Sequence, residues 1–330
     1  MKKTLLTIFT MLGLAICTLN AQETEQFKPS GKTEVLIFTD FNNTSVNGLS
    51  QNKFEVSRAY LGYGYNFTKA FSSRVVLDFA NPGVAGTSAY TAILKYAYLQ
   101  YQENNLTVRF GSIPTTHVEA EEKQWGNRYI MKTFEDLYSF NPSADLGLSV
   151  GYKFNDFISA DAILSNGEGY KSLETDSILK VGVGVTIHPI KELLIRGFYD
   201  SESKNGVAQQ TTALMVGYSN KTFNLAAEYN NQANNKYKNG YNYGGYSVFG
   251  TLFFNSKTGI LARYDNLRSS DNTGKAKSWN FAKDGSQFIF GFQWTPLKGI
   301  RITPNYQVWT PRDGTKTNTS AVFMNVEIKI

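Results

Sequence analysis

Residues 57–79 read SRAYLGYGYNFTKAFSSRVVLDF, and this stretch decides the fold class. Two runs of residues flank a short polar turn, and the side chains within each run alternate between two kinds. Before the turn, Leu61, Tyr63 and Tyr65 share one parity, whereas Arg58 and Gly62 share the other. Alternation with a period of two is typical of a β-strand with two different faces, so these residues are predicted to form a hairpin.

The first 21 residues, MKKTLLTIFTMLGLAICTLNA, have the features of a secretory signal peptide. Two lysines precede an apolar run that is too short to span a bilayer as a helix. A lipoprotein signal that ends at Cys17 is the alternative, but Ile16 is bulky where such a signal needs a small residue. We therefore expect cleavage after Ala21, which removes the one cysteine and leaves residues 22–330 as a mature chain without disulfides.

The charge balance of the mature chain is only weakly basic. Removal of the two lysines of the signal peptide leaves 31 basic and 27 acidic residues, a net charge of +4 that is spread along the chain. This balance argues against a nucleic-acid partner. After the signal peptide, no window approaches the roughly 20 apolar residues of a membrane helix. A soluble all-β protein and a membrane β-barrel remain.

The hairpin pattern continues along the whole chain. Six more short turns follow the first, most of them 30–41 residues apart, which leaves room for two strands and one longer loop between successive turns. Counting outward from the turns predicts sixteen strands, at 32–42, 54–66, 71–80, 91–102, 106–112, 144–154, 157–166, 176–187, 193–201, 210–219, 222–230, 243–254, 259–266, 286–295, 300–309 and 319–330.

Short turns that alternate with longer polar loops are typical of a transmembrane barrel with periplasmic turns and outer loops. A soluble propeller or solenoid could have a similar period, but the units share no sequence signature. A soluble sandwich would show the same alternation, with its apolar face turned inward. The fold class favoured is all-β, a sixteen-stranded antiparallel transmembrane barrel.

Three features indicate that the apolar face meets lipid. Aromatic residues such as Tyr152, Phe154 and Trp294 gather on this face near the short turns, as in the aromatic girdles of membrane barrels. The opposite face carries glycine and charge, as expected of a watered lumen. The last strand ends on Ile330 in strict alternation, which resembles the C-terminal signal read by the barrel-assembly machinery. The predicted location is the outer membrane of a Gram-negative cell.

The stretch FEVSRAYLGYGYNFTKAFSSRVVLDF at 54–79 resembles the Gram-negative porins of the phosphate-selective porin O/P type. It consists of an F-x-x-x-RAYLGY strand followed by an R-x-x-x-D strand, and the resemblance covers essentially the whole mature chain. It implies a water-filled channel for small hydrophilic solutes and ions, with phosphate as one anion it would carry. It also implies a homotrimer, and a third outer loop that folds into the barrel and narrows the channel.

Four basic residues on consecutive strands share the lumen face and could line one wall of the pore: Arg58, Arg74, Lys95 and Arg109. The alternative is that they are solvated and paired with nearby acids such as Asp78.

By position, residues 113–143 are the third outer loop, which is long enough to favour a function. Five acidic residues lie on it: Glu119, Glu121, Glu122, Glu135 and Asp136. If this segment folds inward as a constriction loop, its acids would face the basic wall and set an electric field across the channel. The alternative is an ordinary surface loop with solvated charges.

The sequence favours a general pore with a weak anion preference. A phosphate-selective porin is expected to have a long basic ladder and further inward loops, whereas the fifth outer loop here, about 202–208, is short and the lumen faces carry many acids. We predict no enzyme activity, metal or cofactor, because the two histidines belong to no ligand or catalytic pattern. An outer-membrane lipase and a non-conducting barrel that acts as an adhesin or assembly protein are the alternatives. A plugged transporter would need a longer N-terminal segment.

Overall fold

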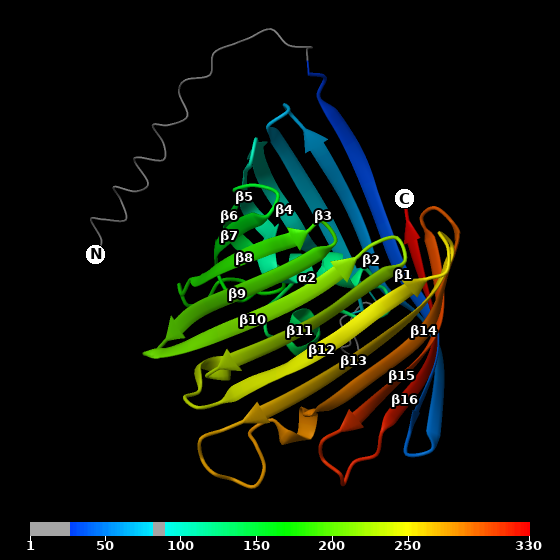
Figure 1. Ribbon diagram of the computed structural model, residues 1–330. Coiled ribbons are helices and arrows are strands. Elements are labelled where there is room, and N and C mark those ends of the chain that lie inside the picture. Colours follow the sequence, from blue (N-terminus) through cyan, green and yellow to red (C-terminus); the bar gives the residue numbers. More distant parts are fainter. Residues whose placement is uncertain (1–26, 82–89) are drawn as a thin grey trace.

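A computed structural model describes residues 27–81 and 90–330. The chain forms a closed antiparallel barrel in which each strand pairs with its neighbours in sequence (Figure 1). The predicted signal peptide, 1–21, lies outside the described residues. The sixteen strands are β1 (Ser30–Val46), β2 (Leu49–Asn66), β3 (Phe71–Ala80), β4 (Thr91–Glu103), β5 (Leu106–Pro114), β6 (Ala144–Lys153), β7 (Ile158–Ser165), β8 (Lys180–Ile190), β9 (Leu193–Lys204), β10 (Val207–Ser219), β11 (Phe223–Ala233), β12 (Asn242–Phe253), β13 (Thr258–Ser270), β14 (Gly285–Leu297), β15 (Ile300–Pro311) and β16 (Thr319–Lys329).

The barrel closes between its first and last strands. β1 pairs with β16 in unbroken register from Leu36 opposite Lys329 to Val46 opposite Thr319. Closure pairs the backbone groups that an open sheet would leave unsatisfied at its edges, which is what a bilayer demands. The predicted fold class, an antiparallel barrel of sixteen strands, is confirmed.

The short turns share a local device that follows from the sequence. In three of them an asparagine side chain accepts two backbone N–H groups further along the turn: Asn155 from Phe157 and Ile158, Asn220 from Thr222 and Phe223, and Asn255 from Lys257 and Thr258. The hydroxyl of Thr68 does the same in the first turn. Such side-chain caps favour a turn over continued strand, which explains why the polar residues between the alternating runs end the strands there.

At the opposite end of the barrel the prediction was wrong in two places. The first hairpin does not stop at residues 42 and 54, because β1 and β2 continue to a tight turn at Asn47–Gly48. The fifth outer loop is likewise a tight turn, at Asn205–Gly206. All four turn residues have φ between 52° and 79°, the left-handed conformation that Asn-Gly pairs adopt in two-residue hairpin turns. The two Asn-Gly pairs were the signals that could have extended these strands.

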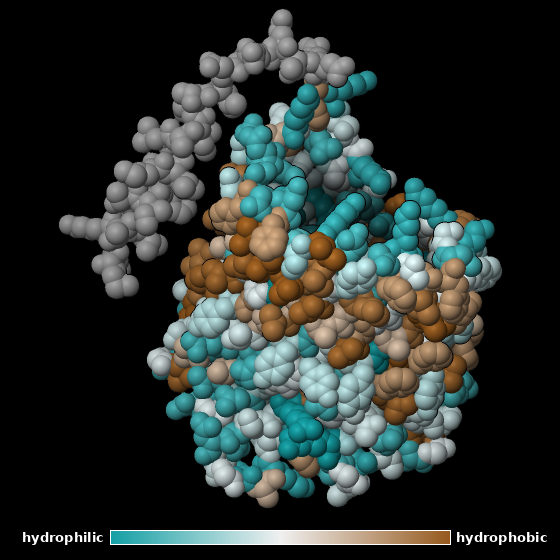
Figure 2. Space-filling view, viewed as in Figure 1, coloured by the Kyte–Doolittle hydropathy of each residue, from teal (hydrophilic) through white to brown (hydrophobic). Residues whose placement is uncertain are grey.

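The two faces of the wall differ as the alternation predicts. Val181, Val183 and Val185 on β8 point outward and are about half exposed, whereas Gly182 and Gly184 between them are buried inside the barrel. Figure 2 shows apolar side chains gathered across the middle of the face in view, with polar side chains above and below them. Among the described residues, no helix is long and apolar enough to cross a membrane.

Candidate functional site

The segment between β5 and β6 lies inside the barrel. It begins with α2 (Thr116–Trp125), which ends at Gly126 in the left-handed conformation, and continues through α3 (Phe134–Tyr138). Gly126 has φ of 68°, which is the usual way to close a helix and redirect the chain. Figure 1 shows α2 within the ring of strands, behind β10 and β11.

Polar contacts hold this inward loop to the far half of the barrel. The amide of Gln124 donates to Asn224 on β11 at 2.7 Å, and the hydroxyl of Tyr129 bonds the Thr303 hydroxyl on β15 at 2.6 Å. The guanidinium of Arg263 on β13 donates to the carbonyl of Lys132 at 2.7 Å. These contacts span strands β11 to β15, so the loop is docked along a broad surface.

Apolar packing accompanies these contacts. Trp125 is 1% exposed and packs edge-on against Phe249 on β12, with ring centroids 5.0 Å apart. Further along the loop, Phe134 and Phe140 are buried with Tyr243 and Leu267. The lumen is therefore not open throughout, because the loop fills one side of it with a hydrophobic core.

Two of the five predicted loop acids are buried against the barrel wall. Glu121 and Glu135 have no exposed surface, and each lies just under 4 Å from Nε2 of His117. Asn141 donates to both Glu135, at 3.0 Å, and Asp200 on β9, at 2.7 Å. The structure places Glu121 and Glu135 in a buried acidic cluster rather than at the passage described below.

The protonation of the buried acidic cluster follows from its surroundings. Burial first, and then the charge of Asp200, raises the pKa of Glu135 to about 8. Burial, and then the neighbouring carboxylates of Glu228 and Glu135, raises the pKa of Glu121 well above its ordinary value. Burial and the nearby Arg196 lower the pKa of His117 to about 3, so its imidazole stays neutral. Docking of the loop thus favours protonated carboxyl groups.

We expect docking of the loop to weaken as the pH rises. A carboxyl group with a raised pKa in the docked state stabilises docking fully below its undocked pKa of 4.5, and this contribution is lost as the pH rises to about 8. Limited proteolysis of the loop should become faster between pH 5 and pH 9, and the E135Q variant should show a flatter dependence. E119Q, which removes a carboxylate outside the cluster, is the control. Equal pH dependence in the native chain and E135Q would contradict the assignment.

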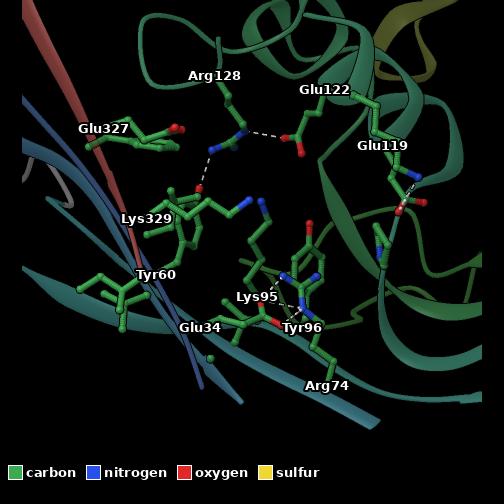
Figure 3. A pocket seen from close by; sticks show the side chains of 18 of the residues that line it. Glu34, Tyr60, Arg74, Lys95, Tyr96, Glu119, Glu122, Arg128, Glu327 and Lys329 are labelled. Carbon is green, nitrogen blue, oxygen red and sulfur yellow. Dashed lines mark hydrogen bonds and ion pairs between the residues drawn. The ribbon is translucent and has the colours of Figure 1, made fainter. Parts of the chain in front are cut away.

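A cavity of about 610 Å³ remains between the loop and the wall formed by β1 to β4 and the end of β16. Figure 3 shows Lys95 and Lys329 extending into it from the wall, and Glu122 and Arg128 facing it from the loop. Six basic and four acidic side chains line it: Lys32, Arg74, Lys95, Lys123, Arg128 and Lys329, with Glu34, Glu119, Glu122 and Glu327.

A second cavity, of about 530 Å³, lies beyond the first. Its lining includes Asp136 and Lys132 of the loop and Tyr170 of the connection between β7 and β8. Arg128, which lines the first cavity, reaches Asp136, which lines the second, at 3.1 Å. The Arg128–Asp136 ion pair lies between the two cavities, and the strand residues that line the second belong to β8 to β11, among them Lys180, Glu202 and Gln232. We call the two cavities together the charged passage.

Three of the four predicted wall cations are paired with acids. Arg58 binds Asp78, Arg74 contacts both carboxylate oxygens of Glu34, and Arg109 binds Glu119 at 2.9 Å. Arg58, Arg74 and Lys95 lie on the β2–β4 wall near one another, whereas Arg109 faces a separate cavity with Thr116 and Arg196. The fourth cation, Lys95, differs from the other three because it contacts aromatic rings instead of an acid.

The remaining loop acids face cations. Glu122 binds Arg128 at 2.5 Å, and Asp136 also binds Lys132 at 2.9 Å. Arg128 and Lys132 were not predicted as site residues, because only the acidic residues of 113–143 were considered. Opposite charges spaced four apart, as in Lys132 and Asp136, were the signal that could have found them.

No family model and no curated protein matches the chain. Among solved structures, it is similar to an anion-selective porin from Comamonas acidovorans, with a TM-score of 0.69 and 10% identity over 92% of this chain and all of that one. The outer-membrane channel DcaP of Acinetobacter baumannii gives a TM-score of 0.68 and 15% identity over 94% of this chain and 100% of that one. The chain has the porin fold.

Salmonella typhi OmpF, in complex with daunomycin, gives a TM-score of 0.67 and 13% identity, covering 90% of this chain and 97% of that chain. At these identities the likeness concerns the fold. The fold matches that of outer-membrane proteins of Gram-negative bacteria, in line with the location predicted from the sequence.

Proposed function

We propose that the protein is an outer-membrane porin that lets small hydrophilic solutes and ions diffuse through the charged passage, with a weak preference for anions. The observation that carries the proposal is the charge of the first cavity, where six basic side chains outnumber four acidic ones. The preference is weak because most of these charges are paired and cancel one another.

The pairing decides which charges act on a passing ion. All four acids of the cavity hold a basic partner: Glu34 with Arg74, Glu119 with Lys123 and Arg109, Glu122 with Arg128, and Glu327 with Arg301. In residues 27–81 and 90–330, Lys32, Lys95 and Lys329 form no ion pair. Three unpaired cations within low-dielectric walls give a positive potential in the first cavity.

The finer parts of the proposal rest on the resemblance of 54–79 to phosphate-selective porins of the O/P type. In this proposal phosphate is one of the anions carried, three copies assemble in the membrane, and the chain is exported with cleavage after Ala21 and inserted by the barrel-assembly machinery. The protein has no enzyme activity. The inward loop and the two cavities of the charged passage support a conducting barrel over an adhesin or assembly protein.

We expect the double variant K32Q/K329Q to shift the reversal potential under a potassium chloride gradient toward cation preference. Both lysines line the first cavity without an acidic partner, so their loss makes the cavity neutral in side-chain charge. Planar-bilayer recording measures the shift. It should shrink as salt rises, since screening acts over about 8 Å at 0.15 M and about 3 Å at 1 M.

The matched control is K191Q/K298Q, which removes the same charge from exposed turn residues outside the cavity. It should leave the reversal potential unchanged. Equal shifts in both double variants would show that overall charge, not the cavity, sets selectivity. A folded barrel with no ion current at any voltage would overturn the porin proposal and favour a non-conducting barrel.

A further inference from the structure

A β-bulge at Lys95 interrupts the pairing of β3 with β4. Val76 pairs with Tyr96, but the next residue of β3, Leu77, pairs with Leu94, so Lys95 is an extra residue without a partner in the register. The extra residue turns two consecutive side chains, Lys95 and Tyr96, toward the lumen, where both are buried. Leu94 and Leu99 on either side remain outward and about half exposed. Bulges of this kind re-aim side chains and are frequent next to functional sites.

The ammonium of Lys95 lies among three tyrosine rings. Its Nζ is 5.1 Å from the ring centroids of both Tyr60 and Tyr96, and 5.8 Å from that of Tyr170. We call these three rings the tyrosine cage. The residue is only 3% exposed, yet within the described part of the chain its ammonium has neither a hydrogen bond nor an ion pair.

This state is costly for a buried ammonium group, which has three donors. Cation–π contacts compensate only part of the lost hydration. The neighbouring guanidinium groups of Arg58, Arg74 and Arg128 each have a carboxylate partner. Lys95 therefore offers three free donors at the side of a cavity, and an anion that enters the cavity would restore the missing partner.

The rest of the cavity wall indicates what kind of anion fits. The wall of the cavity also carries apolar side chains that keep exposed surface, namely the half-buried Leu36 and the exposed Ile330. A bare inorganic anion would leave this apolar surface in contact with water. An anion with an apolar body would cover it, and the gain scales with the apolar area removed from water. The four acids of the cavity are engaged with cations, so they repel such an anion less.

We propose that the first cavity is a binding site for small organic carboxylates. The carboxylate accepts hydrogen bonds from Lys95 inside the tyrosine cage, and the apolar body packs against Leu36. This site deepens the proposed channel function and rests on it, because the passage is the route by which the solute arrives.

The test uses the full mature chain, folded in detergent and in planar bilayers, with benzoate as the probe. Benzoate should reduce the potassium chloride current in a saturable manner, whereas benzamide, which keeps the ring but has no charge, should not. Isothermal titration calorimetry in detergent should show benzoate binding to the same protein. K95M, which keeps the length of the side chain, should weaken binding by about tenfold or more, as expected when a charge-assisted hydrogen bond is lost.

Two further variants guard against a folding artefact. Y170L removes one ring of the cage from a connection outside the strands, and it should weaken benzoate binding several-fold while the barrel stays folded. K298M makes the same chemical change as K95M at an exposed turn, and it should bind benzoate like the native chain.

Each remaining outcome decides between the proposals. Unchanged affinity in both K95M and Y170L would overturn the site. Inorganic phosphate that binds as tightly as benzoate would overturn the organic class of ligand. Calorimetric binding of benzoate to a barrel that passes no current would retain the site and overturn the channel. A native current that benzoate does not reduce, with no heat of binding, would overturn the site and retain the channel.

Discussion

The W125A variant is expected to loosen the inward loop and raise the single-channel conductance. Trp125 is almost fully buried, its Nε1 donates to the carbonyl of Met131 at 2.8 Å, and the guanidinium of Arg263 lies 5.1 Å from its ring. Truncating a buried tryptophan to alanine costs about 3–5 kcal/mol. The sheet closes without this side chain, so the loss falls on docking of the loop rather than on the barrel.

Single-channel recording and limited proteolysis of 115–143 both measure this effect. The control is W294A, which removes the same atoms from the outer face of β14, where Trp294 is 44% exposed. W294A should leave conductance and loop cleavage unchanged. A W125A channel with native conductance and a protected loop would contradict the role given to the hydrophobic core inside the barrel.

The V183R variant is expected to destabilise the barrel by roughly 2–4 kcal/mol, the cost of an arginine on the lipid face near the middle of the membrane. Val183 lies on β8 and points outward with 48% of its surface exposed. Unfolding by urea in lipid vesicles measures the loss.

An arginine inside the barrel is the necessary comparison. Gly182, the neighbour of Val183, is unsuitable, because a Cβ there would lie 2.8 Å from Ile163 and 3.0 Å from Phe198. Gly151 on β6 suits better, since a Cβ there meets no atom within 4 Å and the residue pairs with Asp161 across the strands. G151R should cost much less than V183R. Similar losses of unfolding free energy in V183R and G151R would contradict the assignment of Val183 to the lipid face and Gly151 to the lumen face.

The strands could be predicted from the sequence because a barrel wall imposes one simple rule on each residue. Val183 must be apolar and Gly182 need not be, so period two persists along most of the wall and breaks only locally, as at the bulge of Lys95. The ends of the strands were harder to predict. At Asn47–Gly48 and Asn205–Gly206 the strands run on to the tight turn, and polar side chains there read as loop.

The site was less predictable because it depends on pairings across long stretches of sequence. The alternation of side chains placed Arg58 and Arg74 on the lumen face. Their ion pairs with Asp78 and Glu34 depend on which residues lie opposite one another on neighbouring strands, and the alternation does not specify this. Parity also placed Lys95 on the lumen face, but the bulge that turns Tyr96 inward beside it is marked by no local signal. The burial of Glu121 and Glu135 depends on which face of α2 and α3 meets the far wall, and α3 has only five residues. A short helix carries too little periodicity to fix that face.

The one-sided docking of the inward loop divides the barrel into two halves with different tolerance to change. Most polar contacts of the loop go to β9 to β16, as with Gln124 and Tyr129, whereas β1 to β4 contribute chiefly the wall of the first cavity. In the proposed channel, substitutions in the second group are expected to alter which solutes pass and to leave the support of the loop intact. Its selectivity could then change through a few side chains on adjacent strands, without rebuilding the scaffold that holds the inward loop.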